Sequence, residues 1–199
     1  MFEKLMGRSA QWMKGCADSL DGLSFPTSNR TRVSASLLHL CVEHQTGVHN
    51  LVEHGVIGSA FALLRPQFEA YVRGVWFHRC ANDAQIASYL GGTEPPPIDQ
   101  LLEAIEKLEG YEEGFLLKTK KNVWRNLSDF THGGSIQVKA RNTRDEIVSR
   151  YHDEHIVELI ESSVVLSLLA GAALAGVAGN ENIAHDLWSL YARIYEETP

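Results

Sequence analysis

An arginine and a histidine share one face of a segment that stops at two glycines. Residues 124–134 read WRNLSDFTHGG, a pattern that predicts the last two turns of a helix and its C-terminal cap. Arg125 and His132 are seven positions apart, so at about 100° per residue their side chains point within about 20° of each other, roughly 10 Å apart along the axis. A guanidinium forks onto phosphate oxygens, and an imidazole titrates near neutral pH. Together they suit proton transfer beside a phosphate.

Further polar and basic residues stand close to this pair. Ser128 and Asp129 lie between Arg125 and His132. Three lysines precede them: Lys118, Lys120 and Lys121. The negative end of the helix dipole favours the imidazolium form of a histidine in the last turn. An alternative without chemistry stays open, in which Arg125 pairs with Asp129 at i,i+4 spacing and His132 only caps the helix.

Length and composition suit one soluble globular domain over residues 1–199. The chain is 44% hydrophobic and 22% charged, which allows a sizeable core. Its formal net charge is −7, which argues against a broad nucleic-acid-binding face but leaves room for a small basic site. Cys16, Cys41 and Cys80 have no short spacing, so neither a disulfide framework nor a zinc motif is indicated. We expect a cytoplasmic protein without a cofactor.

Four histidines recur every five residues: His39, His44, His49 and His54. A five-residue step turns about 140° per repeat, so these side chains spiral around a helix and do not line one face. Metal ligands on a helix need a spacing of three or four residues. We interpret the four histidines as ordinary helix residues and predict no metal site.

Apolar residues recur at three- and four-residue spacing along most of the chain, without the alternation of strands. The sequence therefore predicts an all-α fold, an up-and-down bundle of about six to eight helices. The expected long helices are residues 2–20, 31–53, 56–81, 115–132, 145–178 and 181–196, with shorter ones at 82–90 and 100–109. Loops are expected at residues 91–97 and 135–143.

The segment 56–81 is apolar almost all round and is expected at the centre of the bundle. Pro66 lies inside it and predicts a kink near residues 62–65. Arg65 and Glu69 stand at i,i+4 spacing on this apolar helix. Because buried charges need partners, we predict that they pair with each other or with a neighbouring helix. A structural lock between helices is the favoured interpretation, and a ligand-binding role is the alternative.

Residues 162–179 are uncharged for eighteen positions, which is the lower edge of membrane-spanning length. Glu158, Glu161 and Glu181 flank the stretch where a membrane span usually has basic residues, and three serines dilute it. We therefore predict a central bundle helix and no membrane. A transmembrane helix is the alternative.

The Arg125–His132 motif resembles the signature of the HEPN superfamily, small α-helical proteins with an arginine, four to six further residues and a histidine. Six residues separate the two here, and Asn126 occupies the often polar position after the arginine. Residues 63–71, LLRPQFEAY, also resemble bacterial helical families allied to that superfamily. The same signature occurs at three other places: Arg32/His39, Arg73/His78 and Arg150/His155. The Arg125 pair alone combines a shared face, a helix C-terminus and neighbouring lysines.

The resemblance implies a HEPN-like fold and metal-independent cleavage of RNA at a homodimer interface. By this resemblance, His132 exchanges a proton with the 2′-hydroxyl or the leaving oxygen, and Arg125 neutralises charge on the phosphate. Asn126 orients the reacting groups, and Asp129 holds one imidazole nitrogen. The expected substrate-binding residues are Lys118, Lys121 and Ser128. A ribonuclease that acts as a toxin or in phage defence is therefore one hypothesis. The other is a non-catalytic bundle that binds a nucleotide or a protein partner.

Overall fold

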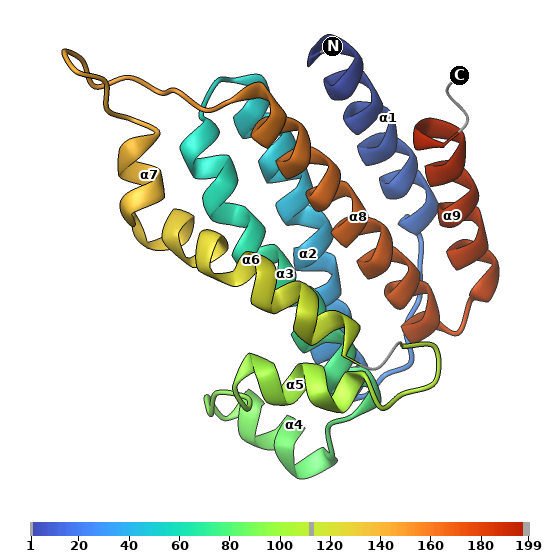
Figure 1. Ribbon diagram of the computed structural model, residues 1–199. Coiled ribbons are helices and arrows are strands. Elements are labelled where there is room, and N and C mark those ends of the chain that lie inside the picture. The colour runs from blue at the N-terminus through green and yellow to red at the C-terminus, as the bar shows by residue number, and fades with distance from the viewer. Residues whose placement is uncertain (1, 112–113, 197–199) are drawn as a thin grey trace.

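The computed structural model describes residues 2–111 and 114–196, and Figure 1 shows that these residues form a bundle of helices. The helices are α1 (Phe2–Leu20), α2 (Asn29–Glu53), α3 (Ile57–Arg79), α4 (Asp83–Leu90), α5 (Ile98–Ile105), α6 (Phe115–His132), α7 (Ser135–Lys139), α8 (Asp153–Ala178) and α9 (Glu181–Tyr195). Within the described residues no strand is present, so the predicted all-α fold is confirmed. The structure has nine helices in these two ranges, against the six to eight expected, because α7 adds a short helix where a loop was expected.

Helix α3 lies at the centre of the bundle, as its apolar sequence predicts. It packs along α2 and also contacts α5, α6 and α8. Gly74 lets α3 approach α2 closely, since a Cβ at this position would lie 2.7 Å from the Leu38 side chain. Leu38 of α2 and Phe77 of α3 are fully buried. Each such side chain contributes roughly 1.5–3 kcal/mol through removal of its apolar surface from water.

Helix α8 is the second central element. Within the described residues it is the one helix long and apolar enough to cross a membrane, and 56% of its most apolar window is buried inside the bundle. Two of the three serines that dilute its apolar run, Ser163 and Ser167, are buried. The indole Nε1 of Trp12 on α1 donates to Ser167 Oγ at 2.7 Å. This burial agrees with the predicted core helix.

A polar network ties α2, α3 and α8 together inside the core. Gln67 of α3 is fully buried, and its amide Nε2 donates to the carbonyl oxygens of Cys41 (3.2 Å) and Ser163 (2.9 Å). The Ser163 hydroxyl donates to Gln67 Oε1 at 2.8 Å. We call these three residues the Gln67 network. Every side-chain atom of the glutamine that can bond has a partner, so the network locks three helices without an unpaired polar group.

Helix α3 continues through Pro66 from Ile57 to Arg79. A proline has no N–H to donate to the carbonyl four residues earlier, here that of Ala62. The Thr131 hydroxyl of α6 lies 3.5 Å from this carbonyl and 2.8 Å from the Leu127 carbonyl of its own helix. The carbonyl that Pro66 leaves free therefore faces a donor on the last turn of α6.

Both ends of α6 are fixed by other parts of the chain. At the start, the buried Glu106 carboxylate accepts the backbone N–H groups of Gly114 (3.0 Å) and Leu117 (2.9 Å). A carboxylate is favourable there because the N-terminus of a helix carries partial positive charge. At the end, Gly133 adopts φ 67°, a left-handed cap that suits glycine. The expected helix 100–109 stops at Ile105, which leaves Glu106 free for this role.

Two boundaries after α6 differ from the expectation. Residues 135–143 were expected to be a loop but begin with α7, and the helix expected from residue 145 begins at Asp153. Residues 140–150 instead form a hairpin arm with a bridge between Asn142 and Ile147, and Figure 1 shows the arm projecting from the bundle.

Side-chain bonds explain why the arm is not helical. The Asn142 amide donates to the Val138 carbonyl at 2.7 Å, and Thr143 Oγ1 accepts the backbone N–H of Glu146 at 3.0 Å. Asparagine and threonine compete in this way with helical backbone bonds. The apolar periodicity of the sequence does not reveal these side-chain bonds.

Candidate functional site

Five side chains join α3 to α6 in what we call the Arg65 cluster: Arg65, Glu69, Trp124, Ser128 and His132. Arg65 Nε donates to Glu69 Oε1 at 2.9 Å, so the i,i+4 ion pair forms. Arg65 Nη1 lies 3.2 Å from Ser128 Oγ and 2.9 Å from His132 Nε2. One arginine thus holds both its structural partner and the candidate catalytic histidine.

The contact with Arg65 fixes the state of the His132 ring. A guanidinium is a donor only, so Nε2 of the imidazole must accept this hydrogen bond. The ring is therefore neutral in this arrangement, with its proton on Nδ1. His132 is exposed to solvent, whereas the side chains of Arg65 and Glu69 are each 23% exposed. A ligand can reach the histidine without opening the bundle.

The guanidinium plane of Arg65 lies over the indole of Trp124, with its Cζ 4.5 Å from the ring centroid. Lys120 Nζ lies 4.7 Å from the same ring and 2.7 Å from Asp99 Oδ1. Stacking of cations on an indole is favourable and restricts the arginine to one plane. Along α6, side chains in four-residue steps form a ridge: Lys120, Trp124, Ser128 and His132. The last three contact Arg65 of α3, and Lys120 contacts Asp99 of α5.

One carboxylate of the cluster serves two arginines. Glu69 is shared between Arg65 and Arg73, whose Nη2 lies 3.5 Å from Glu69 Oε2. Arg73 also lies 3.8 Å from Glu94. The Nη2 nitrogen of Arg65 makes no hydrogen bond within the described residues, so it remains available to an anion beside His132.

The outer face of α6 is basic. Lys118, Lys121, Arg125 and His132 lie within about 60° of one another around the helix, and all four are exposed. Residues 114–150 hold eight of the eighteen Lys and Arg residues and three of the twenty-five Asp and Glu residues. The acidic net charge of the chain therefore conceals one strongly basic segment, which contains α6, α7 and the hairpin arm.

Arg125 lies on the same outer face as His132, as its spacing predicts, but it makes no hydrogen bond or ion pair with any described residue. The alternative pairing of Arg125 with Asp129 is not formed either. The arginine that touches the imidazole is Arg65 of α3. Arg125 is therefore an exposed cation near the histidine and not its direct partner.

Asp129 has a different task from the one expected of it. Its Oδ1 accepts the backbone N–H groups of Ile136 (2.7 Å) and Gln137 (3.2 Å), and the carboxylate lies against Gly134 so closely that a Cβ there would overlap it. Asp129 thus caps α7 and holds no imidazole nitrogen. A carboxylate beside two glycines and a following helix start is itself a capping signal.

Asn126 is also separated from the candidate pair. It lies about 120° around α6 from His132 and lines an apolar groove beside α8. Its expected orienting role next to Arg125 is therefore not supported by its position. The Ser128 hydroxyl accepts a hydrogen bond from Arg65 Nη1 at 3.2 Å and donates to the Trp124 carbonyl at 2.7 Å. Its expected role in substrate binding stays a prediction.

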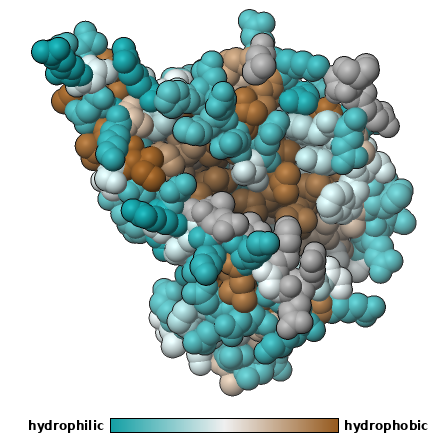
Figure 2. Space-filling view, in the orientation of Figure 1, coloured by the Kyte–Doolittle hydropathy of each residue, from teal (hydrophilic) through white to brown (hydrophobic). Residues whose placement is uncertain are grey.

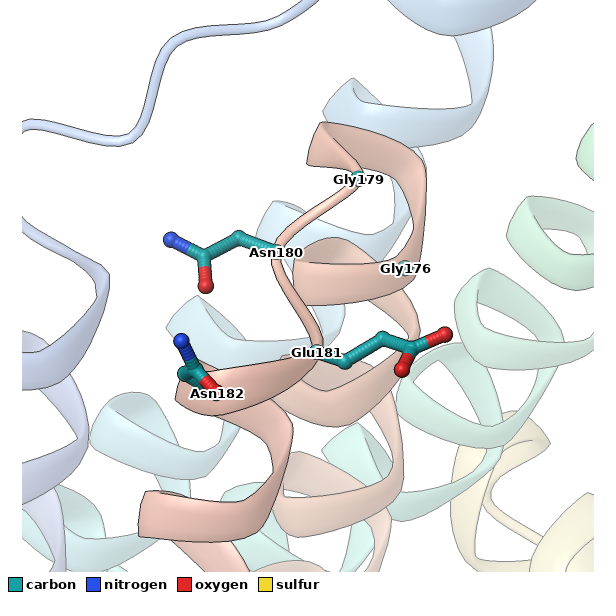
Figure 3. A pocket seen from close by; sticks show the side chains of 5 residues that line it. All are labelled: Gly176, Gly179, Asn180, Glu181 and Asn182. Carbon is teal, nitrogen blue, oxygen red and sulfur yellow. The ribbon is translucent and has the colours of Figure 1, made fainter.

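A second hollow, of about 320 Å³, lies at the turn between α8 and α9. Figure 3 shows its side chains, with Asn180 and Asn182 on one side and Glu181 on the other. Two amides and one carboxylate that point apart do not converge on a ligand. The Arg65 cluster remains the better candidate site.

The fold and the cluster define the class of protein: an all-α bundle with a solvent-exposed arginine–histidine contact between two adjacent helices. Residues 38–199 match the DUF6988 family, described as a family of unknown function, and the chain belongs to this family. Every member of the Arg65 cluster lies within the matched residues. No curated protein matches the chain, and no solved structure matches it.

Proposed function

We propose that this protein is a HEPN-like, metal-independent ribonuclease whose active centre is His132 with Arg65. The observation that carries the proposal is the 2.9 Å contact between Arg65 Nη1 and His132 Nε2 at an exposed position. Support comes from the neighbouring basic face of α6, which offers Lys118, Lys121 and Arg125 to the phosphates of an RNA strand.

In the proposed reaction a phosphate of the RNA first draws Arg65 away from the histidine. The guanidinium then donates to two phosphate oxygens, which frees Nε2 of His132. The neutral imidazole takes the proton of the 2′-hydroxyl, and the 2′-oxygen bonds to phosphorus while the bond to the 5′-oxygen breaks. The leaving 5′-oxygen takes a proton from water, and the hydroxide left behind takes the proton held by His132, which restores the neutral imidazole. The products are a 2′,3′-cyclic phosphate and a 5′-hydroxyl, and Arg65 stabilises the charge that develops in between.

We further propose that two copies act together and that the protein works in the cytoplasm as a toxin or in phage defence. Both statements rest on the resemblance of the Arg125–His132 motif to the HEPN signature. Sedimentation of the purified protein at several concentrations tests the dimer, and a monomer at every concentration would contradict it.

The activity is tested by incubating purified protein with a fluorescent RNA in the presence of a chelator. We expect cleavage by the wild type and a loss of about 10²–10⁴-fold in His132→Ala, because a positioned general base contributes about that much. His39→Ala removes an exposed histidine from α2 and is the matched control. Equal cleavage by wild type, His132→Ala and Arg125→Ala would contradict the proposal.

A further inference from the structure

The hairpin arm of residues 140–150 projects from the bundle after α7 (Figure 1). Backbone hydrogen bonds close the hairpin: the N–H of Val148 donates to the Arg141 carbonyl, and the N–H of Thr143 donates to the Glu146 carbonyl, both at 2.9 Å. Figure 2 shows hydrophilic side chains gathered at the outer end of the arm. The arm is therefore a paired ribbon that the bundle presents to solvent.

Both ends of the arm are attached to the first turns of α3. Before the arm, Gln137 Nε2 donates to the Gly58 carbonyl at 3.1 Å. After the arm, the Tyr151 hydroxyl donates to Gln137 Oε1, and the Tyr151 ring stacks on Phe61 with the ring centroids 5.3 Å apart. Gly58 permits this approach, since a Cβ there would lie 2.7 Å from the Tyr151 hydroxyl. These contacts fix the base of the arm to α3, the helix that carries Arg65.

The cations of the arm have no partners within the described chain. Four of them lie between the end of α7 and the end of the arm: Lys139, Arg141, Arg144 and Arg150. All four are exposed, and none forms an ion pair or a side-chain hydrogen bond with a described residue. The arm also holds Asp145 and Glu146, but neither pairs with these cations. Elsewhere in the described ranges, six cations form ion pairs with carboxylates: Arg8, Lys14, Arg30, Arg65, Arg73 and Lys120.

Unpaired cations on a projecting ribbon suit a polyanion, and the position of the arm favours a nucleic-acid strand. The arm follows the exposed basic face of α6 along the chain, and neutralised phosphates release counterions, which makes binding favourable. Residues 139–150 hold no aromatic side chain on which a base could stack. The arm is therefore suited to phosphates and not to bases. Ile147 is 82% exposed, but one apolar side chain is a weak anchor in a lipid bilayer compared with an amphipathic helix.

We propose that the arm binds the phosphate backbone of the RNA strand that His132 cleaves, an inference that rests on the proposed function. Lys139, Arg144 and Arg150 donate to phosphate oxygens without regard to sequence. From Ser135 to Arg144 the chain spans at most about 24 Å, with helical rise over α7 and extended backbone beyond it. The arm thus extends the RNA-binding surface past the end of α6. Its attachment to α3 keeps the bound strand in one orientation relative to the Arg65 cluster.

The test measures binding of a fluorescent RNA whose 2′-hydroxyls are replaced by methoxy groups, so that the proposed reaction cannot cleave it. In the double variant Arg144→Gln/Arg150→Gln we expect the slope of log affinity against log salt to fall by about 1.4, since each lost phosphate contact contributes about 0.7. The matched control is Arg32→Gln/Arg193→Gln, which removes two exposed, unpaired arginines from α2 and α9 and changes the net charge equally. An equal fall in both double variants would overturn the proposal.

The uncleavable RNA separates this inference from the proposed function. If the wild type cleaves no RNA but the arm variant lowers the slope as expected, the ribonuclease proposal is wrong and RNA binding by the arm is supported. If His132→Ala abolishes cleavage while the arm variant keeps the wild-type slope, the inference about the arm is overturned and the ribonuclease proposal stands. Vesicles of phosphatidylcholine and phosphatidylserine that bind the wild type, but neither the arm variant nor Ile147→Ser, would also overturn it, because the arm would then bind a membrane.

Discussion

Two polar clusters lie two residues apart on α3 and differ in almost every physical respect. Gln67 points into the core, is fully buried and has all its bonds satisfied by α2 and α8. Arg65 points to α6, is partly exposed and holds an exposed histidine whose ring nitrogen is the acceptor. The first cluster has no group left to offer a ligand, and the second has several.

The difference shows how a single helix can serve stability and chemistry at once. A sealed, satisfied network rigidifies the packing of three helices. An open cluster keeps a neutral imidazole, a charged guanidinium and an unused Nη2 donor in contact with solvent. We therefore expect the two clusters to respond differently to substitution: Gln67 through the free energy of unfolding and Arg65 through the reaction rate.

The largest expected effect is on the rate. Arg65→Ala removes the donors proposed to stabilise the developing charge on the phosphate, and we expect RNA cleavage to fall by about 10²–10³-fold. Arg65→Lys keeps the charge but cannot fork onto two oxygens, so it should recover only part of that loss. Initial rates with a chelator present give the measurement. Full activity in Arg65→Ala would show that the arginine is structural only.

The next effect is on stability. Gln67→Ala leaves a cavity and strips the Ser163 hydroxyl of its acceptor, so we expect the free energy of unfolding to fall by about 3 kcal/mol. Glu69→Ala, on the same helix, removes a partly exposed ion pair and should cost about 1 kcal/mol or less. Urea denaturation followed by circular dichroism measures both variants. Similar decreases in the free energy of unfolding for Gln67→Ala and Glu69→Ala would contradict the proposed difference between the buried and the exposed cluster.

A smaller effect concerns the basic face of α6. Lys118→Gln and Lys121→Gln together should reduce the slope of log affinity for single-stranded RNA against log salt by about 1.4, since each lost phosphate contact contributes about 0.7. The matched control is Lys14→Gln, because Lys14 is exposed on α1 and paired with Asp18. Fluorescence anisotropy at several salt concentrations gives the slopes. If the slope changes as much in Lys14→Gln, RNA does not bind specifically at Lys118 and Lys121.

The smallest effect is a pH dependence of the stability of the core. Burial lowers the pKa of His49, against a weaker opposing effect of Glu53. Below about pH 6.5 the unfolded chain therefore binds more protons at His49 than the folded chain does. The contribution of His49 to the free energy of unfolding is fully present above that pH and is lost as the pH falls through the lowered pKa. His49→Gln should flatten this loss relative to wild type in urea titrations from pH 7 to pH 5. His39→Gln, on the same helix but exposed, is the control, and an equal flattening there would contradict the assignment.

The repeating apolar pattern was sufficient to predict most helices. Helix α1 has the predicted limits, and α3 and α8 are central as their apolar sequences indicate. The failures lie where side chains bond to the backbone. Asp129 starts α7, and Asn142 and Thr143 stop the following segment from becoming part of α8. Such bonds depend on single residues, so the spacing of apolar residues does not predict them.

The candidate site was predicted only in part, for a similar reason. The shared face of Arg125 and His132 follows from helix geometry, and the pairing of Arg65 with Glu69 follows from their spacing. The contact between Arg65 and His132 depends on how α3 packs against α6. The spacing of residues within either helix does not predict that packing. The available signal was the ridge of Trp124, Ser128 and His132, because an aromatic and two polar groups in four-residue steps fit a facing arginine.

The most direct measurement of the central claim is the chemistry of the RNA ends after incubation with the wild type and a chelator. If His132 takes the proton of the 2′-hydroxyl, mass spectrometry will find a 2′,3′-cyclic phosphate on one fragment and a 5′-hydroxyl on the other. An RNA with a 2′-deoxy residue at the cut site will stay intact. Intact RNA in every case, or fragments with a 5′-phosphate and a 3′-hydroxyl, would contradict the account.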